Sequence, residues 1–255
     1  MKPDYERIAG DYQEARPQYP ERLVALIAGW LPEGPLEVLD VGAGTGIATR
    51  ALAGVLGRRA SILAVEPSPA MRREAEAATD PAPGIAFRDG SAEALPAQDA
   101  SIDLVFSAQA LHWFDRPTFW RECGRVLKPG GAVAILYNNR DYRRDAFASG
   151  YEDLLERYSP GYRRDYREFD IRGELAALDW TASTHEESEV WTRPMRPNAF
   201  MAMSRSSSRA QAARDAAGAR LFDREVEALM DRHAKTDGAV EVFYRCVLTL
   251  AAKAG

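Results

Sequence analysis

Three glycines at alternating positions, Gly42, Gly44 and Gly46, directly follow a short apolar run. Glycine permits positive φ angles and close approach between backbone and ligand, so this spacing at a strand-to-helix turn is typical of a ligand-binding loop. A nicotinamide-binding loop would need glycine in place of Ile47, and a phosphate-binding P-loop would need a lysine that this segment lacks. Asp40, beside the loop, would repel a pyrophosphate and attract an ammonium group. The loop therefore favours a ligand with an amino acid end.

A second group of side chains with possible chemical roles lies further along the chain. His112 is one of only three histidines, and Trp113 follows it directly. An imidazole can act as a general base, orient a substrate, or pack against the neighbouring ring, and the sequence leaves these three roles open. Cys123 and Cys246 are far apart and lack metal-ligand spacing, so neither a disulfide framework nor a zinc site is expected.

Short apolar runs alternate with amphipathic stretches in the first half of the chain. Strands are predicted at 36–41, 62–65, 85–88, 102–107 and 132–137, and helices at 47–56, 69–78 and 117–127. This alternation predicts a doubly wound α/β fold, in which a parallel sheet carries helices on both faces. Lys128 to Gly131 is expected to form a turn before the fifth strand.

The second half of the chain is less regular. Helices are expected at 146–158, 172–178 and 221–233, a possible strand at 186–191, and a closing strand or a helix at 242–251. With no repeat or linker, the sequence predicts one domain over residues 1–255. Its expected parts are lead-in helices at 1–30, an α/β core at 36–137, and helices with closing strands at 138–255.

Composition argues against several classes of partner. The chain has 33 basic and 38 acidic residues and a net charge of -5, so it lacks the basic footprint typical of nucleic-acid binding. No apolar run approaches the roughly 18 residues that a membrane helix needs, and the charged N-terminus is unlike a signal peptide. We expect a cytoplasmic protein, a monomer or homodimer, whose partner is a small molecule and which needs no metal.

The segment from Leu39 to Gly46 resembles motif I of the class I S-adenosylmethionine-dependent methyltransferases. Later segments resemble further motifs of that family in the same order: 65–71, 90–96, 101–105 with 108–114, and 125–131. The resemblance covers about residues 5 to 140 and leans toward the trans-aconitate and ubiquinone/menaquinone-biosynthesis methyltransferases. It implies a seven-stranded, mostly parallel Rossmann-like sheet with an N-terminal helical lid and helical insertions in the C-terminal half. It also implies transfer of the methyl group of S-adenosylmethionine to a small-molecule acceptor by in-line displacement.

The resemblance assigns roles to single residues. Glu66 is expected to accept hydrogen bonds from both ribose hydroxyls, and Met71 either to pack on the adenine edge or to be plain core. Many relatives have Asp at the position of Ser91, where it accepts from the adenine amino group; Ser91, Asp89 or Glu93 are the candidates here. The expected cofactor-binding residues are Tyr12, Arg16, Asp40, Gly42, Gly44, Gly46, Glu66, Pro67, Met71, Ser91, Ala92, Glu93 and Ala108, and the expected catalytic residues are His112, Trp113 and Tyr19.

The first 20 residues resemble the N-terminal signature of the family at Tyr12, Arg16 and Tyr19. Arg16 is expected either to clamp a carboxylate of the cofactor or substrate, or to cap a surface helix. We expect this segment to form a mobile lid over the cofactor and the acceptor.

The region after the fifth strand is expected to supply the acceptor pocket. Six of the ten tyrosines fall between Tyr137 and Tyr166, which suggests aromatic walls. Between Arg140 and Arg172, eight arginines are balanced by eight acidic residues, so no anion site is expected there.

Two other functions stay open on the sequence alone. A nicotinamide-dependent oxidoreductase would share the sheet but needs a different glycine spacing. A non-catalytic S-adenosylmethionine-binding protein would keep the glycine loop and lose the acceptor site. The sequence does not indicate whether oxygen, nitrogen, carbon or a carboxylate is methylated.

Overall fold

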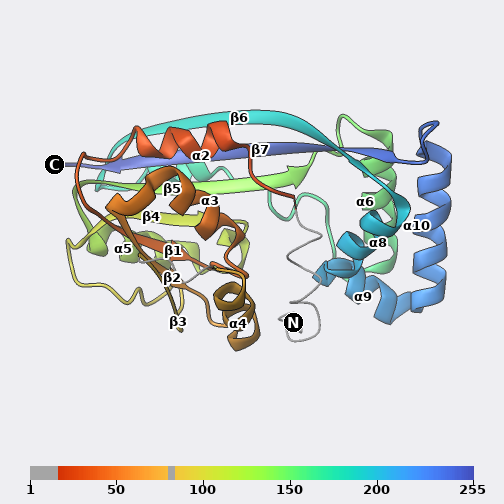
Figure 1. Cartoon of the computed structure of the whole chain (residues 1–255), viewed down its shortest axis with the longest axis horizontal. Helices are drawn as coiled ribbons and strands as arrows, with labels where there is room; N and C mark the ends of the chain where they lie inside the picture. The colour runs from red at the N-terminus through yellow and green to blue at the C-terminus, as the bar shows by residue number, and fades with distance from the viewer. Residues whose placement is uncertain (1–16, 80–83) are drawn as a thin grey trace. The chain divides into compact units, whose positions relative to one another are not determined.

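The computed structural model describes residues 17–79 and 84–255, which form two compact units (Figure 1). The sheet unit contains residues 18–137, 169–189 and 246–255. The helical unit contains Pro17 and residues 138–168 and 190–245. The prediction of a single domain over the whole chain stays a prediction.

The described part of the chain contains a seven-stranded sheet with the order β3-β2-β1-β4-β5-β7-β6. Its strands are β1 (Leu36–Val41), β2 (Ala60–Val65), β3 (Ile85–Arg88), β4 (Ile102–Ala108), β5 (Leu127–Arg140), β6 (Thr181–Met195) and β7 (Val240–Lys253). Strands β1 to β5 pair in parallel, and β7 runs antiparallel (Figure 1). The predicted doubly wound, mostly parallel sheet is confirmed.

The helices of the sheet unit begin at residues suited to helix starts. They are α2 (Glu21–Ala28), α3 (Ile47–Leu56), α4 (Pro69–Ala77), α5 (Arg116–Val126) and α7 (Ile171–Ala176), with short 3-10 turns η2 (Gly57–Arg59) and η3 (Leu111–Trp113). Ser68 caps α4 by accepting from the Met71 N–H, and Asp115 caps α5 by accepting from the Thr118 N–H. A proline early in each helix strengthens the same signal.

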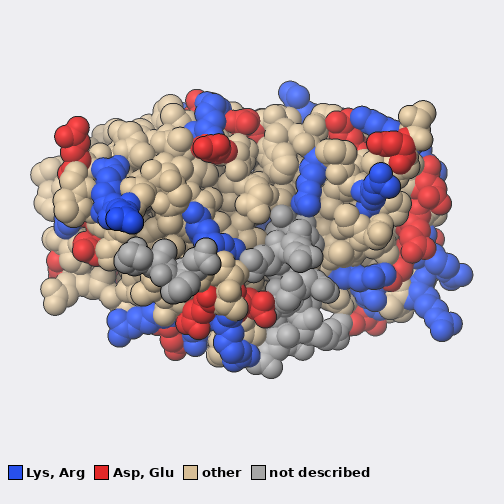
Figure 2. All heavy atoms as spheres, in the orientation of Figure 1, with Lys and Arg blue, Asp and Glu red and all other residues tan. Residues whose placement is uncertain are grey.

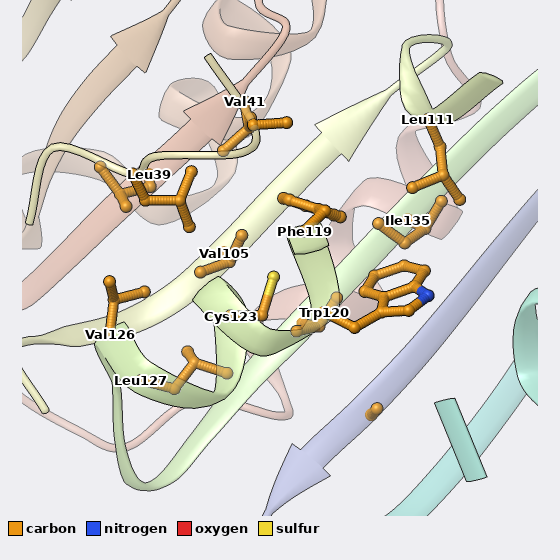
Figure 3. Close-up of a cluster of buried hydrophobic side chains, with 14 of the residues drawn as sticks. Leu39, Val41, Val105, Leu111, Phe119, Trp120, Cys123, Val126, Leu127 and Ile135 are labelled. Carbon is orange, nitrogen blue, oxygen red and sulfur yellow. The ribbon is translucent and has the colours of Figure 1, made fainter. Parts of the chain in front are cut away.

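Helix α5 packs its apolar side against the strands of the sheet, including β4, which leads to the candidate site. Its buried stripe of Phe119, Trp120, Cys123 and Val126 follows helical spacing. Figure 3 shows these side chains packed against residues of β1, β4 and β5. Burial raises the pKa of the Cys123 thiol, which fits a core residue and not a reactive one.

Two predicted boundaries were wrong. The expected turn from Lys128 to Gly131 lies inside β5, which begins at Leu127 because that residue pairs with Ile102 before the register shifts. Gly130 keeps the positive φ of 77° that the turn signal indicated. Strand β6 covers 15 residues, far more than the predicted 186–191, because an edge strand can be polar and exposed along most of its length.

The helical unit packs around its own aromatic core. Its helices are α6 (Ala146–Tyr158), α8 (Pro197–Arg205), α9 (Ser208–Ala217) and α10 (Ala219–His233). Phe200 packs edge-to-face on Phe147 and Tyr151, with ring centres 4.8 and 5.0 Å apart, and Phe222 is fully buried in the same cluster. The expected helical insertions are therefore present in the C-terminal half.

The surface of the molecule carries charges of both signs. On the face shown in Figure 2, basic and acidic side chains are interspersed. Within residues 17–79 and 84–255, no helix has the length and apolar character needed to cross a membrane.

Candidate functional site

The glycine loop, residues 42–46, follows β1 at the point where the order of strands in the sheet reverses. Such switch points are where open α/β sheets bind ligands. Gly42, Gly44 and Gly46 have φ angles of +74°, +58° and +76°. The N–H groups of Gly42 and Ala43 donate to the carbonyl of Val65 at 2.8 and 3.1 Å. The loop is therefore joined to the carboxyl end of β2.

The three glycines meet different surroundings. A Cβ at Gly42 would lie 2.5 Å from the Cβ of Ala110, and one at Gly46 would lie 3.1 Å from the ring of Phe87. A Cβ at Gly44 would meet no atom of the described residues within 4 Å. Gly42 and Gly46 thus satisfy packing within the protein, whereas Gly44 leaves space in which a ligand can approach the backbone.

Glu66 holds the loop from the end of β2. Its Oε2 accepts from the Gly44 N–H at 3.0 Å, and its Oε1 accepts from the Ser68 N–H at 2.9 Å. Burial raises the pKa of this carboxyl group, and the two backbone N–H groups oppose that shift. Each carboxylate oxygen can accept more than one hydrogen bond, so Glu66 keeps capacity for ligand hydroxyls.

Asp40 lies fully buried in β1. Its Oδ2 accepts from the Thr49 hydroxyl on α3 at 2.6 Å, and its Oδ1 has no hydrogen-bond partner among the described residues. Burial raises the pKa of Asp40 to about 7, the Thr49 hydrogen bond opposes that rise, and the negative charge of Glu66 adds to it. The sequence showed the charge at this position but not its burial.

His112 lies in η3, the turn that follows β4. Its backbone N–H donates to the Tyr137 hydroxyl at 3.1 Å, and its Nδ1 lies 3.2 Å from the same oxygen. The Trp113 ring contacts the imidazole in a tilted arrangement, with ring centres 4.9 Å apart, and Trp113 is 42% exposed. Tyr137 and Trp113 therefore fix the imidazole on two sides.

The carboxyl ends of β1, β2 and β4 bring the main predicted residues together. Ser107 of β4 donates from its hydroxyl to the carbonyl of Val41 at 2.8 Å, and Ala110 touches the position of the Gly42 Cβ. The glycine loop, Glu66 and the segment from Ala108 to Trp113 thus form one continuous surface of the sheet unit.

Other predicted residues lie around this surface. Met71 and Ala92 are each 3% exposed, so core packing accounts for both, whereas Pro67 is exposed between β2 and α4. Ser91 forms a bridge with Ala94.

Glu93 is exposed and accepts from the Asp115 N–H at 3.1 Å. Tyr19 precedes α2 in the sheet unit. Tyr12 and Arg16 lie outside the described residues. The same holds for residues 1–16 of the segment that was expected to form a lid.

Two contributors were missed by sequence reasoning. Arg72 donates to the Glu66 carbonyl at 2.5 Å and to Asp89 at 2.8 Å, which joins the ends of β2 and β3. Tyr137 is the second. The sequence grouped it with five other tyrosines as a possible wall of the acceptor pocket and did not predict its contact with His112. The signal that could have found it is the parallel pairing of the fourth and fifth strands, where Ala108 lies opposite Leu136.

Among residues 17–79 and 84–255, no three His, Cys, Asp or Glu side chains lie in a group that could hold a metal ion. The residues do suit S-adenosylmethionine. Gly44 leaves room for close approach, Glu66 can accept from hydroxyls, and the unpaired Oδ1 of Asp40 is an acceptor near the same loop.

A glycine loop at the switch point of a sheet with this order and an antiparallel β7 defines the class I methyltransferase fold. A family model described as a methyltransferase domain matches residues 39–135. A malonyl-[acyl-carrier protein] O-methyltransferase of Dechloromonas aromatica is 31% identical over 195 residues, covering 72% of this chain and 71% of that protein. The chain belongs to the class I S-adenosylmethionine-dependent methyltransferase family.

Further comparisons agree on the family. An uncharacterized methyltransferase of Mycobacterium tuberculosis is 37% identical over 143 residues, which is 56% of this chain. The match spans about half the length of that relative, 55%. A solved structure from Anaeromyxobacter dehalogenans, provisionally named a type II methyltransferase, is 28% identical with a TM-score of 0.66, covering 93% of this chain and 97% of the other.

Proposed function

We propose that this protein binds S-adenosylmethionine at the glycine loop and transfers the methyl group to a small-molecule acceptor. The observation that carries the proposal is the arrangement of Gly44 and Glu66. The open space at Gly44 lies next to a carboxylate that already fixes the loop and still has acceptor capacity. When bound, S-adenosylmethionine would supply the methyl group: the acceptor would bond to the methyl carbon in line while the sulfur leaves with the electron pair as S-adenosylhomocysteine, and no covalent catalysis by the protein is needed.

In this proposal, the carboxylates of the site divide the recognition of the cofactor. Glu66 accepts from the ribose hydroxyls, and Asp40 favours the positively charged amino acid end of the ligand. A nearby ammonium group favours the ionised form of Asp40 and so offsets the burial that raises its pKa.

We assign His112 an orienting role. The Tyr137 oxygen accepts the backbone N–H of His112, so the arrangement that satisfies both groups directs the tyrosine proton to Nδ1. A neutral imidazole that accepts at Nδ1 carries its own proton on Nε2. In that tautomer Nε2 holds a proton and does not serve as a base, which leaves His112 a role in orienting the acceptor.

Calorimetry with S-adenosylhomocysteine tests the cofactor site. Wild-type protein should bind at about micromolar strength. Gly44→Val should abolish binding, because a side chain would fill the open space, whereas Gly54→Val, at an exposed position on α3, should bind like wild type. Absence of heat in the wild-type titration, or equal binding by both variants, would remove the proposed site.

A fluorescence titration with NADH separates the oxidoreductase alternative. The proposal expects no binding of the dinucleotide, because the glycine spacing differs from that of a nicotinamide-binding loop and the Asp40 carboxylate would repel a pyrophosphate. Saturable NADH binding that S-adenosylhomocysteine displaces would favour the alternative instead.

A further inference from the structure

Two half-buried arginines of the helical unit, Arg167 and Arg209, lack an acidic partner in the described part of the chain. Arg167 donates from Nη1 to the Asn139 amide oxygen at 3.3 Å, and the contacts of Arg209 are with tyrosine rings. The Nε of each arginine is buried without an acceptor. Burial of a guanidinium without a counter-charge is unfavourable, because water that would solvate it is removed.

Tyrosine rings hold the two guanidinium groups close to each other. The central carbons of Arg167 and Arg209 lie 4.8 and 4.9 Å from the centre of the Tyr166 ring. Arg209 also lies 5.7 Å from the ring of Tyr162, which packs edge-to-face on Tyr166. Cation–π contacts attract the charges but do not neutralise them. Two like charges therefore remain near one aromatic pair.

Two carboxylates of the same unit, Glu152 and Glu168, already have basic partners. Glu152 is 4% exposed, pairs with Arg140 at 2.7 Å and accepts from the Tyr162 hydroxyl at 2.5 Å. Glu168 pairs with Arg143 at 2.7 Å. Basic and acidic residues are equal in number between Arg140 and Arg172, but these carboxylates pair with other arginines. Among the described residues, Arg167 and Arg209 therefore carry positive charge that no carboxylate balances.

We propose that Arg167 and Arg209 form a binding site for an organic molecule that carries carboxylate groups. The planar fork of arginine matches a carboxylate, and the hydrogen bonds formed are charge-assisted. The rings of Tyr162 and Tyr166 supply an apolar wall for the carbon skeleton of the ligand. This site goes beyond the proposed methyl transfer and lies wholly within the helical unit.

Calorimetry with glutarate, a simple dicarboxylate, tests the site. Wild-type protein should bind glutarate with a Kd of about 1 mM or tighter, and Arg167→Gln and Arg209→Gln should each weaken binding by about tenfold or more. Glutaramide, which has the same skeleton without charge, should not bind. Arg157→Gln is the matched control, because Arg157 also lies near a tyrosine ring but is exposed, and its variant should bind like wild type.

A measurement on the wild-type chain keeps the proposal testable if a variant fails to fold. Phenylglyoxal modifies arginines, and mass spectrometry can follow each residue separately. Glutarate should slow modification of Arg167 and Arg209 and leave that of Arg157 unchanged. The proposal is overturned if glutarate gives no heat, if all three variants bind it equally, or if it protects neither arginine. Binding of S-adenosylhomocysteine, measured separately, is independent of these results.

Discussion

Replacing Asp40 by asparagine tests whether burial controls the charge beneath the glycine loop. The asparagine side chain has the same shape, and its oxygen can still accept from the Thr49 hydroxyl. It cannot ionise. The variant therefore removes the charge of Asp40 while keeping its packing.

The direction of the effect follows from the two states of the chain. In the unfolded chain Asp40 loses its proton near its ordinary pKa of 3.8, whereas in the folded chain burial raises the pKa to about 7. The free energy of unfolding contributed by this group therefore falls as pH rises from about 4 to 7, and then stays constant.

The magnitude follows from the same shift. Each pKa unit corresponds to about 1.4 kcal/mol, so the ionised carboxylate costs on the order of 4 kcal/mol at pH 8. About 2 to 3 kcal/mol of that cost develops between pH 5 and pH 8. Relative to wild type, ligand-free Asp40→Asn should gain stability by that amount across this interval.

Urea unfolding at pH 5 and pH 8 measures the difference. Asp103→Asn is the control, because Asp103 accepts from Lys128 at 2.7 Å and its neutralisation should destabilise the protein at both pH values. If the stability difference between Asp40→Asn and wild type is the same at pH 5 and pH 8, the reasoning about Asp40 is refuted.

Three further predictions concern the loop and the histidine. Glu66→Ala should lower S-adenosylhomocysteine affinity by about 2 to 4 kcal/mol and also lower the Tm, because the N–H groups of Gly44 and Ser68 lose their acceptor. Unchanged affinity in calorimetry would place the ribose elsewhere. Gly42→Ala should lower the Tm more than Gly44→Ala, because only a Cβ at Gly42 would lie 2.5 Å from the Cβ of Ala110. Gly44→Ala should reduce ligand binding more than Gly42→Ala. A larger loss of Tm in Gly44→Ala, or a larger loss of binding in Gly42→Ala, would contradict the assignment of the open space to Gly44. Tyr137→Phe should lower kcat by about tenfold at constant KM for S-adenosylmethionine and shift the pH–rate profile; an unaltered profile would exclude a positioning role.

The first half of the fold could be predicted because local signals agree there. Strands β1 and β3 and helix α3 match their predicted bounds, since apolar runs are flanked by glycines or charged residues. Strand β6 could not be delimited in this way. Its burial alternates irregularly and most of its residues are partly or fully exposed, so its pairing with β7 depends on contacts far away in the sequence.

The site was predictable where spacing carries the information. The three glycines and Glu66 follow a motif, and in the structure Gly44 donates a hydrogen bond to Glu66. The bond between Tyr137 and His112 depends on the register of two strands, and the pairing of Arg209 with Arg167 around Tyr166 depends on helix packing. Neither kind of tertiary arrangement leaves a local pattern in the chain.

The glycine loop is held by two adjacent residues at the end of β2, through the carbonyl of Val65 and the carboxylate of Glu66. A loop fixed before the ligand arrives loses little further backbone entropy on binding. Association should then be a simple diffusional encounter, and substitutions in the loop should act mainly on the dissociation rate. A catalyst of methyl transfer must exchange S-adenosylhomocysteine for S-adenosylmethionine in every cycle, so the stiffness of this loop sets how long the product stays bound.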